Sequence, residues 1–381
     1  MNGTMERNEQ METGKVRRLR FDAVNTGYMD KYTLITGGAG FIGTNLADRL
    51  LRMGRSVLVF DNFSRPGVEI NFEWLRQEHG ERAQLIRGDV RDRKALKDAI
   101  RGADSIFHFA AQVAVTTSLH SPVFDFEVNA MSTLNILEEL RALDDPPPLV
   151  FTSTNKVYGG LEDIELVQNQ TRYYPSDQDI LENGISETRN LDFHSPYGCS
   201  KGAADQYVID YARTFSVPAA VFRMSCICGP HQCGTEDQGW VAHFLISALE
   251  DRRITIYGDG MQVRDILFVD DLLNAFIAAR ENISSISGQA FNIGGGPKNS
   301  VSLLELIDLL GRLRKKPVSV EIANWRPADQ RYFVSDTRKF ASLTGWQPEV
   351  GVAEGIRRMF DWFQTGRLSH RGFGASVVER W

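Results

Sequence analysis

The sequence lacks three features that would have indicated other classes of protein. Its four cysteines all lie between Cys199 and Cys233, so no disulfide framework spans the chain. It contains no apolar run as long as a membrane span, and residues 1–30 carry scattered charges without the apolar centre of a signal peptide. It has no basic excess, because the formal net charge is -6. We therefore expect a cytoplasmic protein that binds neither a membrane nor nucleic acid.

The composition is that of a globular protein, with 42% hydrophobic and 24% charged residues. A chain of 381 residues is long for one core, which predicts a large α/β domain and a smaller lobe. We expect a disordered extension over 1–30, a dinucleotide-binding domain over 31–225, a lobe mainly for substrate over 226–365, a strand near 289–293 that returns to the first domain, and a tail over 366–381.

A glycine-rich turn near the start organises the chain. It follows an apolar run over residues 32–35 and precedes an amphipathic segment, and its sequence is Thr36-Gly37-Gly38-Ala39-Gly40-Phe41-Ile42-Gly43. A strand, a glycine turn and a helix in this order are typical of a doubly wound sheet that binds a dinucleotide, although an ordinary turn is the alternative. The first free amides of the helix, at Phe41 and Ile42, would face the phosphates.

An acid about 20 residues beyond the glycines indicates which dinucleotide binds. Asp61 ends the second predicted strand, where its carboxylate can accept hydrogen bonds from the adenosine ribose of NAD and would repel the 2′-phosphate of NADP. Arg65 nearby keeps NADP open, and a helix-capping acid is the structural alternative. We expect NAD. Other residues expected around it are Asn62, Ser64, Asp89, Val90, Ala110, Ala111, Gln112 and Thr152.

Strands and helices alternate through the first half of the chain, which predicts a parallel sheet. The later strands are expected at residues 84–86, 105–109 and 149–153, and one helix is expected to run from 123 to 143. Between 160 and 194 the periodicity fails and the composition turns polar and acidic. A loop of this length is usually functional or mobile, so a cover over the substrate is one interpretation of it.

A tyrosine and a lysine lie one helical turn apart. Tyr197 and Lys201 open a predicted helix, and four residues at 100° each bring both side chains to one face. Taken alone, the pair is equally well explained as two surface residues that happen to lie one helical turn apart. Together with the glycine turn, Asp61 and Thr154, it indicates a catalytic site.

With these residues in order, the chain resembles the extended short-chain dehydrogenase/reductase family over about residues 31–363. The motifs that carry the resemblance are Gly37-x-x-Gly40-x-x-Gly43, Thr154 before Val157-Tyr158-Gly159, Tyr197-x-x-x-Lys201, and Arg264-Asp265 before Val269-Asp270-Asp271. Within the family it is most similar to the nucleotide-sugar epimerases, above all to those that act at C2 of CDP-linked sugars. The resemblance implies a Rossmann-type fold, a tightly bound and recycled NAD, and a homo-oligomer with helices from 123 and 197 paired across a dimer.

Two departures from the family pattern narrow the expected activity. The 4,6-dehydratases carry an Asp-Glu pair after the catalytic threonine, whereas this chain has Asn155 and Lys156. Loss of water then has no evident acid and base, so dehydration is disfavoured. Cys226 stands where many 4-epimerases and dehydratases have an asparagine that contacts the substrate, which favours a 2-epimerase.

The resemblance also assigns roles to single residues. Tyr197 would be the base, Thr154 would orient the reacting hydroxyl, and Lys201 would hold the nicotinamide ribose. Free tyrosine has a pKa of ~10, so the positive charges of Lys201 and of NAD+ would have to lower it. The expected substrate-binding residues are Thr154, Asn155, His194, Cys226, Trp240, Arg264 and Arg326. For the two arginines, expected at the pyrophosphate, protein salt bridges are the alternative.

Three other interpretations of the sequence compete with a 2-epimerase, and the residues favour them to different degrees. A nucleotide-sugar 4-epimerase would use the same residues, because the chemistry at Tyr197 serves C2 and C4 alike. A dinucleotide-binding module without catalysis is disfavoured by intact Thr154, Tyr197 and Lys201. Four soft ligands occur in Cys226-x-Cys228-x-x-His231-x-Cys233, but structural zinc sites draw on two separated pairs, so we expect no metal.

Overall fold

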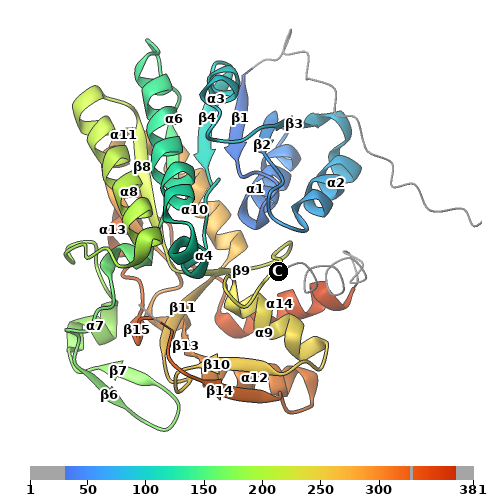
Figure 1. The fold of residues 1–381 in the computed structure, drawn as a ribbon, viewed down its shortest axis with the longest axis vertical. Helices are drawn as coiled ribbons and strands as arrows, with labels where there is room; N and C mark the ends of the chain where they lie inside the picture. The colour runs from blue at the N-terminus through green and yellow to red at the C-terminus, as the bar shows by residue number, and fades with distance from the viewer. Residues whose placement is uncertain (1–30, 327–328, 366–381) are drawn as a thin grey trace, which may run out of the picture.

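A computed structural model of the chain describes residues 31–326 and 329–365 (Figure 1). The expected extension over 1–30 and the expected tail over 366–381 lie outside the described residues. Among the helices that are described, none is both long enough and apolar enough to cross a membrane.

A seven-stranded parallel sheet forms the centre of the larger part, which confirms the expected doubly wound α/β fold. Its strand order is β12-β8-β5-β4-β1-β2-β3. The bounds are β1 Tyr32–Thr36, β2 Val57–Asp61, β3 Ala83–Arg87, β4 Ala103–His108, β5 Leu149–Thr154, β8 Ala219–Met224 and β12 Ala290–Ile293. Since β1 pairs with both β2 and β4, the winding reverses between β1 and β4, which is where such sheets bind ligands.

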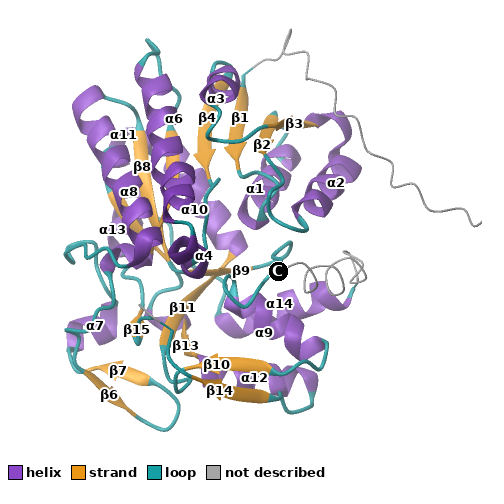
Figure 2. Ribbon diagram, viewed as in Figure 1, coloured by secondary structure: helices purple, strands orange, loops and turns teal. Residues whose placement is uncertain are grey.

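Helices cover both faces of this sheet (Figure 2). One face carries α1 Phe41–Arg52, α2 Val68–His79 and α10 Val269–Glu281, and the other carries α3 Arg93–Ile100, α6 Ser132–Arg141 and α8 Ser195–Phe215. Alternate side chains of a strand enter opposite cores, as the pleat requires: Val57 and Val59 pack on the first face, and Leu58 and Phe60 on the second.

The helix expected from 123 to 143 is interrupted. The chain forms α4 Val115–His120, α5 Pro122–Phe126, a wide π-helical turn at Glu127–Met131, and then α6. The Asn129 side chain in this turn accepts a hydrogen bond from the Gln112 amide at 2.9 Å and donates one to the Gln112 carbonyl at 3.0 Å. The widened turn therefore directs an amide side chain at the loop after β4, a constraint that apolar periodicity does not report.

The smaller part contains short sheets and three longer helices. Strand β11 pairs with β13 in antiparallel and with β9 and β15 in parallel orientation, and β10 pairs with β14. The bounds are β9 Cys226–Cys228, β10 Ile254–Tyr257, β11 Val263–Phe268, β13 Ser300–Ser302, β14 Val320–Ala323, β15 Tyr332–Phe333, α9 Trp240–Leu249, α12 Leu303–Arg314 and α14 Val352–Gln364. Its apolar side chains join the core on the α1 and α10 face, so both parts share one core.

The segment over 160–194 is more ordered than its composition predicts. It contains the hairpin β6 Leu166–Gln168 and β7 Tyr173–Pro175, and the helix α7 Gln178–Asn183. It also contributes Ile185 to a third apolar cluster with Tyr158 and Phe333. The remaining short elements are α11 Ile283–Ile286, α13 Arg338–Thr344 and the 3-10 turns Gly80–Arg82, Asn155–Tyr158 and Pro297–Asn299.

Candidate active site

The glycine turn has a shape that other residues would disturb. Gly37 has φ +67°, and a Cβ there would lie 2.7 Å from the Ala110 backbone nitrogen. A Cβ on Gly43 would lie 2.5 Å from Gly38 Cα. Gly40 precedes α1 in extended backbone, with Phe41 and Ile42 in the first helical turn. The turn therefore packs tightly where the winding of the sheet reverses, and the N-terminus of α1 points to the same place. This arrangement fits the pyrophosphate of a dinucleotide.

Asp61 lies at the end of β2, against this turn. One carboxylate oxygen accepts a hydrogen bond from the Ala39 amide at 3.0 Å, and the other accepts one from the Phe63 amide at 2.9 Å. Burial raises the pKa of Asp61 above its usual value, although both amides oppose the shift. Each oxygen keeps a further lone pair, so the carboxylate can still accept a ribose hydroxyl.

The other residues expected at the adenosine end gather at the tips of β2 and β3. Asn62 donates to Asp89 at 3.0 Å, and the Ser64 amide donates to Asn62 at 2.9 Å. Hydrogen bonds from Arg91 lower the pKa of Asp89 to about 2, so Asp89 is charged at neutral pH. Val90 beside it is buried in the core.

The residues expected along the opposite wall follow β4 and β5. Ala110 approaches the glycine turn, and Ala111 beside it is half-buried. The Gln112 side chain donates to Asp125 at 2.8 Å, and the Thr152 hydroxyl donates to the His108 carbonyl at 3.2 Å. The side chains of Gln112 and Thr152 are thus engaged in hydrogen bonds within the protein, so a ligand here would mainly meet their backbone atoms.

Thr154, Tyr197 and Lys201 are brought together at the end of β5 and the start of α8. Tyr197 is 8% exposed and its hydroxyl shares a hydrogen bond with Thr154. Burial raises the pKa of Tyr197 to about 12, against the opposing effect of Thr154. Lys201 Nζ donates to the Thr152 carbonyl at 2.6 Å, and burial lowers the pKa of Lys201 to about 7.

These shifts differ from the expected ones. A general base near neutral pH needs a phenol with a lowered pKa, whereas in the chain itself burial dominates and raises that of Tyr197. The group that opposes the effect of burial on the pKa of Tyr197 is Thr154, through its hydrogen bond. Tyr197 therefore requires further positive charge beside its phenol before it can accept a proton.

Sequence reasoning missed a buried polar group behind the tyrosine. Asp125 is fully buried and accepts hydrogen bonds from Ser200, Gln112 and Asn129. Its negative charge raises the pKa of both Tyr197 and Lys201. The π-helical turn that positions Asn129 leaves no signal in the hydrophobic pattern, which is why this group was not anticipated.

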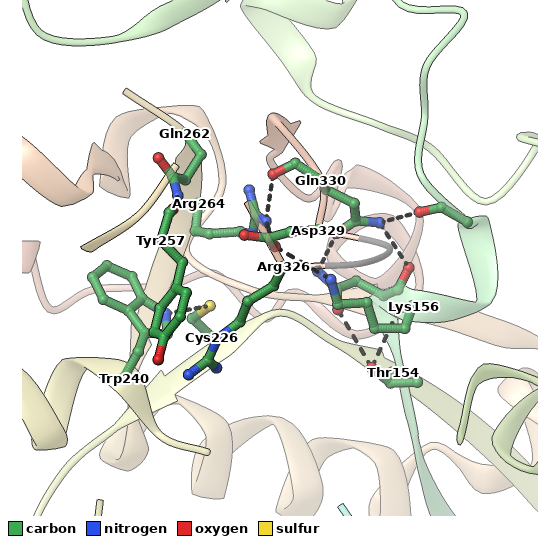
Figure 3. Close-up of polar contacts among 12 residues, drawn as sticks. Thr154, Lys156, Cys226, Trp240, Tyr257, Gln262, Arg264, Arg326, Asp329 and Gln330 are labelled. Carbon is green, nitrogen blue, oxygen red and sulfur yellow. Dashed lines mark hydrogen bonds and ion pairs between the residues drawn. The ribbon is translucent and has the colours of Figure 1, made fainter. Parts of the chain in front are cut away.

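Five of the expected substrate-binding residues lie around one polar cluster, namely Thr154, Cys226, Trp240, Arg264 and Arg326 (Figure 3). The Trp240 indole donates to Cys226 Sγ at 3.2 Å. Arg264 is 7% exposed and its Nη2 donates to Asp329 at 2.8 Å and to the Gln330 carbonyl at 2.5 Å. The Arg264 guanidinium is therefore neither open to solvent nor part of a surface salt bridge, because it is buried and its partner Asp329 is half-buried.

Arg326 lies over the ring of Tyr257, with 4.0 Å from its guanidinium carbon to the ring centroid. It donates to the Glu236 carbonyl at 3.1 Å and lies 3.5 Å from the Asp237 carboxylate. Its partners are thus surface acids at the rim of the cluster, and a phosphate would have to compete with them.

His194 is placed apart from this cluster. It lies 3.2 Å from Asp192 and lines a cavity of about 540 Å³ beside Tyr158 and residues 160–163. Cys226, Trp240 and Arg264 are not among the lining residues of that cavity. The expected place of His194 at the sugar stays a prediction.

Asn155 is buried and connects the catalytic strand to a distant segment. It donates to the Gln330 side chain at 3.3 Å, and Gln330 donates in turn to the Gly159 carbonyl at 2.7 Å. Lys156, next to Asn155, pairs with Asp329. The sequence analysis assigned no role to Lys156, Asp329 or Gln330, because their contacts join positions more than 170 residues apart.

The cysteines and histidine of the crowded motif do not converge. His231 packs at a tilt against Trp74 and Trp362, with ring centroids 4.2 and 5.1 Å away, and burial lowers its pKa to about 4. Over residues 31–326 and 329–365, no three His, Cys, Asp or Glu side chains are arranged to hold a metal ion.

Comparison with known proteins extends across nearly the whole described chain. Residues 34–359 match the sequence profile of the family described as GDP-mannose 4,6 dehydratase. The CDP-paratose 2-epimerase of Salmonella typhi is 44% identical over 336 residues, which cover 86% of this chain and 98% of that enzyme.

Two solved structures share the fold. The UDP-glucuronic acid 4-epimerase of Bacillus cereus, in complex with UDP-glucuronic acid and NAD, superposes with a TM-score of 0.75 at 27% identity, covering 88% of this chain and 99% of that one. The UDP-glucose 4-epimerase of Thermus thermophilus, in complex with NAD, gives a TM-score of 0.72 at 30% identity, covering 87% and 99%.

Proposed function

Because this chain belongs to the GDP-mannose 4,6-dehydratase-like family of extended short-chain dehydrogenases/reductases, we propose that it is an NAD-dependent isomerase that epimerises a nucleotide sugar. The preferred substrates are CDP-paratose and CDP-tyvelose, interconverted at C2. The observation that carries this proposal is the grouping of Thr154, Tyr197 and Lys201 at the carboxyl end of the sheet. The 44% identity to a CDP-paratose 2-epimerase supports the choice of substrate.

Epimerisation requires that a stereocentre become flat and be rebuilt from the other face. Bound NAD+ supplies the chemistry for this, because it can take up a hydride and later return it. Tyr197 accepts the proton of the reacting hydroxyl, and Thr154 orients that hydroxyl toward the phenol. A misplacement of about 1 Å can cost on the order of 100-fold in rate, so the contact between Thr154 and Tyr197 matters for turnover.

The sugar must turn over between the two hydride transfers while the nucleotide stays bound. Arg264 and Arg326 are the proposed pyrophosphate ligands, since guanidinium groups match phosphate oxygens. Both already bind acids or carbonyl groups of the protein, so a phosphate would rearrange these contacts. Cys226 and Trp240 form the proposed wall of the sugar pocket.

Dehydration is disfavoured for a chain with this site. Asn155 is buried in a hydrogen bond to Gln330, and Lys156 is paired with Asp329. Neither can replace the acid and base that loss of water from the sugar requires.

A 4-epimerase of UDP- or CDP-hexoses is the second candidate. Two proteins that share the fold are described as UDP-sugar 4-epimerases, and the same three residues would serve oxidation at C4. The pose of the sugar decides between the two carbons.

A homo-oligomer is the proposed assembly. It is supported by apolar side chains that are exposed on α4, α5, the π-helical turn and α8, namely Leu119, Val123, Phe124, Phe126, Met131, Tyr207 and Phe215. A second copy would bury this face. The proposed compartment is the cytoplasm, since the four cysteines are unpaired, as is typical of reducing conditions.

The decisive experiment is incubation with CDP-paratose in deuterated water, followed by NMR of the sugar protons. Formation of CDP-tyvelose with protium kept at C2 supports internal hydride return. Inversion with deuterium at C2 would mean proton abstraction and would remove Tyr197 from its proposed role. Turnover of a UDP- or CDP-hexose at C4, without reaction of CDP-paratose, would select the second candidate.

A further inference from the structure

Lys156 lies directly beside the catalytic threonine. It is the second residue after Thr154, and its backbone amide donates to the Thr154 hydroxyl at 3.2 Å. Its side chain is 23% exposed and extends into the cluster of Figure 3, where Nζ lies 3.6 Å from Asp329 Oδ1. A lysine at this place is therefore held within the site and not on the outer surface.

Two cations share one carboxylate in this cluster. Asp329 is 3.6 Å from Lys156 Nζ and 2.8 Å from Arg264 Nη2. Burial alone would raise the pKa of Asp329, but Arg264 and Lys156 outweigh it and lower the pKa, so the carboxylate stays charged. Asp329 therefore fixes the position of both cations in the described part of the cluster.

Lys156 also faces the wall proposed for the sugar. Burial raises the pKa of the Cys226 thiol and lowers the pKa of Lys156, and each of the two groups opposes the shift of the other. Cys226 accepts the hydrogen bond from Trp240. Lys156 thus belongs to the same cluster as Thr154, at the reacting hydroxyl, and Cys226, at the proposed sugar wall (Figure 3).

From this arrangement we propose that Lys156 is a substrate-binding residue of the sugar pocket, whose ammonium donates a hydrogen bond to a sugar oxygen and stabilises the negative charge that develops there as the hydroxyl proton leaves. Asp329 is its positioning residue, because it holds the ammonium in place. The inference rests on the proposed epimerase function. It also accounts for a lysine at a position where the dehydratases of the family have an acid.

The test compares Lys156→Met with the wild-type enzyme. Loss of a preorganised charged donor is expected to lower kcat about 100-fold, because the charge matters most as the oxygen becomes negative. The dissociation constant of CDP, which lacks the sugar, should stay within about twofold. Lys156→Arg should restore part of kcat, whereas Lys316→Met, at an exposed ion pair with Asp251, is the matched control and should change nothing.

A double-mutant cycle tests the role of Asp329. If Asp329 acts through Lys156, Asp329→Asn should lower kcat in the wild-type background and cost little more in the Lys156→Met background. Asp329→Asn should also move the alkaline decline of kcat to lower pH. The groups near the ammonium are Asp329, Arg264 and Cys226, and removal of the carboxylate leaves Arg264 to favour the neutral amine.

Three results would overturn the inference. The first is a Lys156→Met enzyme with kcat within about twofold of wild type. The second is a parallel loss of CDP affinity and kcat, which would indicate a structural role. The third is full additivity in the cycle. Each of these differs from failure of the proposed function, in which the wild-type protein itself turns over no nucleotide sugar.

Discussion

The ammonium of Lys201 donates a hydrogen bond to the carbonyl oxygen of Thr152, 2.6 Å away, and is thereby held at the end of β5. It also lies 4.2 Å from the centroid of the Phe151 ring, among buried side chains. Burial lowers the pKa of Lys201 to about 7 and raises that of Tyr197 to about 12. The two groups expected to cooperate are thus both biased toward their neutral forms.

This bias predicts how Tyr197 titrates. Without a dinucleotide, the phenol should stay protonated to about pH 11 or higher, since its pKa is about 12. With NAD+ bound, the positive nicotinamide should favour the phenolate and lower the pKa toward neutrality. Ultraviolet difference titration of wild type against Tyr197→Phe, with and without NAD+, measures this. Identical titration curves in the two states would contradict the proposed activation of Tyr197.

The glycine turn predicts a second outcome. In Gly43→Ala, the new Cβ would lie 2.5 Å from Gly38 Cα and 2.6 Å from the Gly37 carbonyl, so the turn must shift. We expect NAD affinity to fall at least about 10-fold in a calorimetric titration. Gly311→Ala is the control: its Cβ meets the Lys316 carbonyl at an ordinary 3.6 Å, and in the interior of α12 it should stabilise the fold by up to about 1 kcal/mol. Equal NAD affinity of both variants would argue against a phosphate site at the turn.

Asp61 predicts the cofactor preference. Replacement by serine removes the negative charge that would repel a 2′-phosphate, so the ratio of NADP affinity to NAD affinity should rise at least about 10-fold. Competition binding with both dinucleotides measures the ratio. Asp98→Asn, an exposed acid on α3, should leave it unchanged. If Asp61→Ser also leaves the ratio unchanged, Asp61 is only a structural acid that caps the Ala39 and Phe63 amides.

A buried ion pair behind the site predicts a large effect on stability. Arg223 and Asp205 form two hydrogen bonds of 2.9 Å, and their side chains are 5% and 0% exposed. Arg223→Met leaves the carboxylate buried without its partner and should lower the free energy of unfolding by about 3–5 kcal/mol. Arg357→Met, at the exposed pair with Glu354, should cost far less, because water screens that pair. Denaturant unfolding of the two variants distinguishes these values, and equal losses would refute the argument.

The parallel sheet and the grouping of Tyr197 with Lys201 could be predicted because their signals are local. The apolar strands alternate with helices, and Tyr197 and Lys201 lie within one helical turn. The glycine turn and Asp61 follow consecutive strands, so the sheet topology alone brings them to one edge.

The polar cluster could not be predicted in the same way. Lys156 and Asp329 meet only because the segment after β14 returns to the end of β5, and no short-range pattern encodes that return. Sequence reasoning therefore placed Asn155 at the substrate, interpreted Lys156 only as a missing acid, and overlooked the contacts of both with residues 329 and 330. Burial also raises the pKa of Tyr197, a contribution that no short-range pattern reports, because desolvation depends on packing from all sides.

The place of β12 at one edge of the sheet has a consequence for biosynthesis. Its partner β8 ends at Met224, whereas β12 is complete only at Ile293, and until then β8 offers an open edge for pairing. At about 5–20 residues per second, a ribosome needs roughly 3–14 seconds for that interval. A chain that stops before residue 290 should therefore aggregate during expression, whereas recovery of that fragment as a stable monomer would show that the edge is protected by other means. Termination of synthesis within this interval would leave the edge of β8 open to pairing with other chains, and completion of β12 closes that edge.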